Sequence, residues 1–102
     1  MAPPQVRFQF AERAPFDEIT ITLELSKIAV EGLFGVARVR LDAAYRIDHE
    51  NQSIVISERR EPGRAFVRIF TSLLIREFGE QAFLVERLVP QACSAKRGRG
   101  VL

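Results

Sequence analysis

Alternating apolar and polar residues are the clearest pattern in this chain, and they predict β-strands. Every second position from Ile19 to Leu25 is apolar, which is typical of a half-buried strand over residues 18–25. A longer alternation of the same kind ends at Ile47 and predicts a second strand over residues 36–48. In that second strand Arg38, Arg40 and Arg46 are expected to point outward.

Three shorter segments complete the expected sheet. The polar residues 49–52 precede a β-branched run, which predicts a hairpin into a strand over residues 53–58. Residues 82–89 are expected to form a final strand, which ends before Pro90. Near the N-terminus, alternate residues are again apolar and predict a short edge strand: Val6, Phe8 and Phe10.

The spacing of apolar residues changes to that of a helix after Pro62, which is tolerated in a first helical turn. The helix is expected over residues 64–78, with Gly79 as its C-cap. We therefore predict an α+β fold in the order β-β-β-β-α-β. It is a mainly antiparallel sheet of four or five strands with one helix packed on one face.

Two segments carry more apolar residues than this fold needs. The apolar arc of the helix is wider than contact with one sheet requires, and the connection 27–35 is unusually apolar for a surface loop. These residues either close the end of the core or contact a second chain. The candidate protein-interface residues are Leu33, Phe34, Val67, Ile75 and Phe78.

Length and charge define one domain and a basic tail. A chain of 102 residues suits a single core, which we place in residues 1–92. Of the 15 Lys and Arg residues, three lie in the last nine residues, which contain no acid; the other 12 face 13 acids. Residues 93–102 are thus a basic tail on a nearly neutral domain. No segment is apolar enough to cross a bilayer, and we expect a cytoplasmic protein.

Few residues suited to catalysis are present. The chain has one histidine and one cysteine, Cys93, and neither a phosphate-binding glycine loop nor zinc-ligand spacing. Asp48, His49 and Glu50 are clustered, but charged residues are expected in a hairpin turn. Glu77 falls on the apolar side of the expected helix, where it is either hydrated or paired with an arginine. We predict no enzyme activity, cofactor or metal site.

Two functions are compatible with these patterns. The first is a non-catalytic protein-interaction or regulatory module that forms a homo-oligomer, most simply a two-fold dimer, or binds a larger protein. The alternative is a nucleic-acid-binding protein, although no aromatic residues are interleaved with its arginines for base stacking. Its phosphate contacts would come from basic residues of the sheet, the helix and the tail: Arg38, Arg40, Arg46, Arg64, Arg68, Arg76, Lys96, Arg97 and Arg99.

Overall fold

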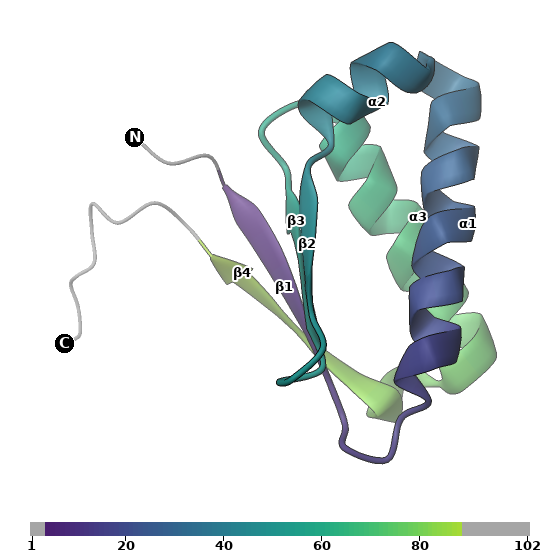
Figure 1. The fold of residues 1–102 in the computed structure, drawn as a ribbon, viewed down its shortest axis with the longest axis vertical. Coiled ribbons are helices and arrows are strands. Elements are labelled where there is room, and N and C mark those ends of the chain that lie inside the picture. The colour runs from purple at the N-terminus through teal and green to yellow at the C-terminus, as the bar shows by residue number, and fades with distance from the viewer. Residues whose placement is uncertain (1–3, 89–102) are drawn as a thin grey trace, which may run out of the picture.

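A computed structural model of the chain describes residues 4–88, which form a four-stranded sheet with helices on one of its faces (Figure 1). In chain order the elements are β1 Gln5–Phe10, α1 Phe16–Phe34, α2 Val36–Asp42, β2 Tyr45–Asp48, β3 Ser53–Ser57, α3 Glu61–Phe78, the 3₁₀ turn η1 Glu80–Ala82, and β4 Phe83–Leu88.

The sheet has the order β2-β3-β1-β4, and all neighbouring strands are antiparallel. Apart from the short helix α2, the chain follows the β-α-β-β-α-β order of ferredoxin-like, or split β-α-β, domains. The first strand was expected at the edge, and this prediction is wrong. β1 lies between β3 and β4 because Val6, Phe8 and Phe10 fill the centre of the core.

The second half of the chain folds largely as its sequence pattern indicates. The β2–β3 hairpin, helix α3 and the last strand β4 all form. Pro62 stands in the first turn of α3, and Gly79 ends that helix with a φ of 86°. The N–H of Gly79 donates to the carbonyl oxygen of Ile75 at 3.1 Å. The predicted α+β class with an antiparallel sheet is therefore confirmed.

The strand expected over residues 18–25 is wrong, because this segment lies in the first half of helix α1. The helix has one buried stripe, formed by Ile19, Leu23, Ser26 and Val30, and a second apolar stripe on its opposite side. Two apolar sides on one helix make every second residue apolar, and this imitates the period of a strand. The connection expected at 27–35 is the last part of the same helix.

The strand expected over residues 36–48 is also wrong in its first half. Residues 36–42 form helix α2, whose buried contacts come from Val39 and, just after its end, Ala43, four positions apart. Only the second half of the expected strand forms, as β2. Arg38 and Arg40 are consequently on a helix and not on the sheet. The single-helix order β-β-β-β-α-β is replaced by an order with three α-helices.

Aromatic side chains dominate the core between the sheet and the helices. The Phe8 ring packs edge-on against Phe70 of α3, with 5.0 Å between centroids. Phe10 contacts both Phe16 of α1 and Phe83 of β4, at 5.8 and 6.0 Å. Strand β1 thus joins both long helices to the last strand through two phenylalanines.

The first turn of α3 lies against backbone from two other segments. A Cβ atom built on Gly63 would lie 2.0 Å from the carbonyl oxygen of Ser57 and 3.2 Å from that of Asp42. Only glycine leaves room for this approach. Position 63 therefore fixes how closely α3 sits on the end of β3.

The predicted basic tail lies outside the described residues. It comprises residues 93–102 and includes Cys93, Lys96, Arg97 and Arg99. Within residues 4–88, the longest helices are too polar to serve as a membrane span.

Candidate protein-interaction surface

Helix α1 exposes a row of large apolar side chains on the side that faces away from the core. Ile21, Leu25 and Ile28 are 60%, 54% and 60% exposed. Their spacing of four and three residues places them on one side of the helix, and we call them the α1 stripe. Single exposed leucines are ordinary, but a row at helical spacing resembles the contact face of a helix that packs against another protein.

At its C-terminal end the α1 stripe leads to a hollow between α1 and α3. Leu33, 68% exposed, and Phe34 form one wall, and Ile69 with Ala65 forms the apolar part of the other. The hollow has a volume of about 480 Å³ and is open to solvent. It extends the apolar surface of α1 onto a second helix.

Charged residues differ between the two ends of this surface. Asp17 and Glu18 are exposed in the first turn of α1. Arg64 and Arg68 line the hollow at the opposite end, with Glu61 beside them. Within residues 4–88 neither arginine has a carboxylate close enough for an ion pair. The surface is therefore mainly acidic at one end, where Arg76 in the last turn of α3 is the exception, and mainly basic at the other.

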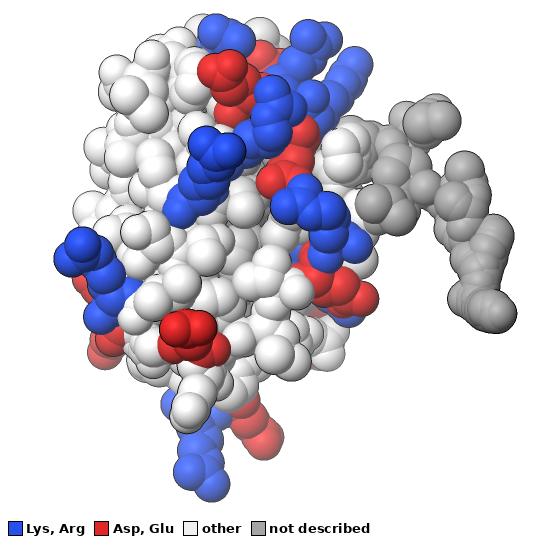
Figure 2. All heavy atoms as spheres, turned by 180° about the vertical axis from the view of Figure 1, so that it is seen from behind, with Lys and Arg blue, Asp and Glu red and all other residues white. Residues whose placement is uncertain are grey.

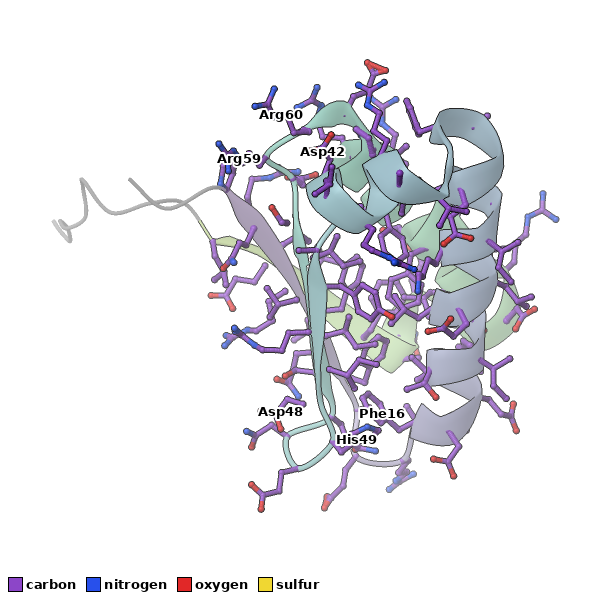
Figure 3. All side chains as sticks on the ribbon, turned by 45° about the horizontal axis from the view of Figure 1, so that its top comes forward. Phe16, Asp42, Asp48, His49, Arg59 and Arg60 are labelled. Atoms are coloured by element: carbon purple, nitrogen blue, oxygen red, sulfur yellow. The ribbon has the colours of Figure 1, made fainter. Side chains whose placement is uncertain are left out.

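Figure 2 shows the molecule from behind, with basic side chains gathered over its upper part beside a wide uncharged area. Arg38 belongs to this end of the molecule, with its guanidinium 5.3 Å from the centroid of the Phe34 ring. It also pairs with Asp42, four residues on, at 3.7 Å. Arg59 and Arg60 lie at the same end, at the start of α3 (Figure 3).

The five interface residues predicted from the sequence do not form one surface. Leu33 and Phe34 lie together in the hollow, near the start of α3. Ile75, 42% exposed, and the partly buried Phe78 lie near the other end of that helix. Val67 is only 8% exposed and belongs to the core. Leu33 is the most accessible of the five.

The arginines proposed for nucleic-acid contacts are spread over several surfaces. Arg38, Arg40, Arg64 and Arg68 lie at the α2 end of the helices, whereas Arg76 is in the last turn of α3. Arg46 is on β2, on the opposite side of that strand from the core residues Tyr45 and Ile47. The structure therefore does not bring all of these cations onto one face.

The open face of the sheet, which no helix covers, carries few free charges. On β1, Arg7 forms an ion pair with Glu86 of β4. The neighbouring Val55 is 8% exposed although it faces away from the helices. On the opposite side of β4, Arg87 pairs with the buried Glu58. Arg46 also lies on the open face of the sheet. Among the described residues it forms no ion pair.

The acidic turn at residues 48–50 has a structural role in the hairpin. The Asp48 carboxylate accepts hydrogen bonds from the Asn51 side-chain amide at 2.8 Å and from the Asn51 backbone at 3.2 Å. The side-chain bond in particular holds the pKa of Asp48 below its ordinary value. His49 packs edge-on against Phe16, 5.5 Å between ring centroids, as Figure 3 shows. Residues 4–88 contain no cluster of three metal-ligating side chains.

Polar contacts hold the two flanks of α1 in place. On one flank the Tyr45 hydroxyl donates to Glu24 at 3.1 Å, and burial raises the pKa of Tyr45 while Glu24 adds to this rise. On the other flank the Thr22 hydroxyl lies 3.4 Å from a carboxylate oxygen of Glu77 on α3. Glu77 is exposed, so it needs no arginine partner. The α1 stripe lies between these two flanks.

Comparison of the chain with protein-family models, curated proteins and solved structures gave no match.

Sequence reasoning did not identify the main part of this surface. Ile21 and Leu25 were assigned to the core side of a strand, although their spacing with Ile28 is that of one helical side. A signal was present in residues 27–35, whose apolar character led to two alternatives, closure of the core or contact with a second chain, and Leu33 is 68% exposed. Treating residues 16–34 as one helix would have linked the two segments.

Proposed function

We propose that this chain is a non-catalytic protein-interaction or regulatory module that binds another protein chain through the α1 stripe and the adjoining hollow. The observation that carries this proposal is the apolar row Ile21, Leu25 and Ile28 on the outer side of α1. Fully burying such a side chain is worth about 1.5–3 kcal/mol, so three together favour contact with an apolar partner surface. A cytoplasmic location stays a prediction from the sequence.

The charged rim supports a protein partner over a small ligand. The hollow is open to solvent, whereas small-molecule sites enclose most of their ligand. An apolar centre bordered by exposed charges is the usual composition of a protein–protein contact. In such contacts the rim fixes the orientation and the centre supplies most of the affinity.

Site-specific photo-crosslinking in the native cell tests this proposal. We expect a benzoyl-phenylalanine at position 25 to give adducts of discrete mass with protein. The same group at position 46, on the open face of the sheet, serves as the control, because Arg46 is also exposed but lies away from α1. Absence of protein adducts at position 25, or equal adducts at both positions, would overturn the proposal.

Nucleic-acid binding is a second candidate, favoured by the gathering of arginines at the α2 end of the helices. Phosphate contacts release counterions, so affinity for a single-stranded oligonucleotide should fall steeply as salt increases. We expect weak binding at low salt that disappears at physiological salt. Binding that persists there and is lost in the R64E/R68E variant would place this function above protein binding.

A further inference from the structure

The two ends of the α1 surface carry opposite charge, and this determines which partner fits it. On the basis of the proposed protein-binding function, we infer that the occupant is a second copy of this chain. The two α1 helices pack antiparallel across a two-fold axis that passes near Leu25. The inference rests on the apolar centre of the stripe and on the charges at its two ends.

The apolar residues are arranged symmetrically enough for this pairing. Leu25 lies between Ile21 and Ile28, four residues after one and three before the other. In an antiparallel pair centred near Leu25, Ile21 of each copy comes opposite Ile28 of the other copy. Each of these side chains is more than half exposed in the single chain, and the pairing covers all three. In any two-fold contact, a residue that meets a second residue of the partner copy is matched by the same pair in reverse.

The ends of the stripe match when the second copy is reversed. Glu18 precedes Leu25 by seven residues and Gly32 follows it by seven, so each lies about 10 Å from the centre along the helix. Reversal therefore places Glu18 beside Gly32 of the second copy. Gly32 has nothing within 4 Å of the position of a Cβ atom, and it leaves open space for the approaching carboxylate.

Glu18 lies on the side of α1 that faces Arg64 and Arg68 of the second copy. Glu18 stands one turn before Thr22, which contacts Glu77 of α3, so Glu18 is on the α3 side of the stripe. The two-fold axis lies in the plane of contact between the two α1 helices and is perpendicular to them. It therefore places the α3 helices of both copies on the same side of the α1 pair. Glu18 then faces Arg64 and Arg68 of the second copy, and the pairing occurs twice.

Other arrangements of two copies lack this match. A parallel two-fold pair would bring Glu18 of both copies to the same end of the interface and put the α3 helices on opposite sides, so that Glu18 would not face Arg64 and Arg68 of the second copy. Antiparallel packing also opposes the dipoles of the two long α1 helices. Charge complementarity therefore favours a reversed second copy.

Sedimentation equilibrium of the full chain and its charge variants tests this inference. We expect the wild-type chain to be dimeric at about 100 µM and L25E to be monomeric there. E18R alone and R64E/R68E alone should each weaken the dimer about tenfold to a hundredfold, because both symmetric contacts become repulsive. The combined E18R/R64E/R68E variant restores opposite charges and should recover most of the lost affinity.

A matched control separates the specific contact from a change in net charge. E50R makes the same charge change as E18R in the exposed hairpin turn, and it should leave the dimer unaffected. The inference fails if the wild-type chain is monomeric, if L25E remains dimeric, or if the combined variant is no tighter than E18R alone. A monomer that still gives protein adducts from position 25 in the cell would remove the second copy as occupant and leave the proposed function standing.

Discussion

Replacing Phe70 with aspartate is expected to leave the chain unfolded at room temperature. Phe70 is fully buried, and its ring contacts Phe8 at 5.0 Å and Phe10 at 6.4 Å between centroids. Removing a buried phenylalanine side chain costs about 3–5 kcal/mol, and the new carboxylate adds a further cost because it has no partner there. A domain of this kind has a total stability of roughly 5–15 kcal/mol.

The control for this prediction is Ile75 to aspartate on the same helix. Ile75 is 42% exposed, so the charged side chain can reach water and the fold should survive. Circular dichroism and thermal unfolding distinguish the two variants. A cooperative transition for F70D near the wild-type temperature would contradict the described core. Because Ile75 lies outside the α1 stripe, I75D should also keep the mass of the wild-type assembly, although the sequence pattern had made Ile75 a candidate interface residue.

A methyl group at position 63 should lower the free energy of unfolding by about 3 kcal/mol, although alanine is ordinarily the better helix residue by about 0.5–1 kcal/mol. The reason is the 2.0 Å separation between a Cβ atom at Gly63 and the carbonyl oxygen of Ser57. That oxygen belongs to backbone at the end of β3 and cannot rotate away as a side-chain tip would. Either α3 or the β3 end must move, and both lie on the core.

Gly32 to alanine is the matched control, because a Cβ atom there meets nothing within 4 Å. It should raise the stability by about 0.5–1 kcal/mol. Both changes are best measured by urea unfolding in the L25E background, so that association does not contribute. If G63A proves as stable as its parent, the close approach of α3 to β3 is not a feature of the folded protein.

The sequence correctly predicted those elements whose local pattern fits only one kind of secondary structure. Helix α3 was found because its buried residues recur at helical spacing, and strand β3 because a β-branched run follows a polar turn. Helix α1 was missed because apolar residues occupy both of its sides, and because Ile19 to Thr22 is a run of β-branched residues that favours a strand locally. In the fold, Thr20 and Thr22 instead donate to carbonyl oxygens of the preceding turn.

The same ambiguity explains how much of the candidate surface was found. Leu33 and Phe34 stood out because they lie in a segment that was expected to be a polar loop. Ile21 and Leu25 did not, since an alternating strand pattern accounts for them without any exposure. Arg64 and Arg68 were named as candidate phosphate contacts, but their position at one end of α1 depends on how α1 and α3 pack, which no local pattern contains.

The central place of β1 has a consequence for how the chain folds as it is made. β1 precedes the other strands, yet it pairs with residues 53–57 on one side and 83–88 on the other. Its Phe8 and Phe10 cannot be enclosed until both segments have been synthesised, so the sheet closes late and through contacts distant in sequence. Such contacts slow folding, and a chain that stops before β4 leaves one edge of β1 without its partner.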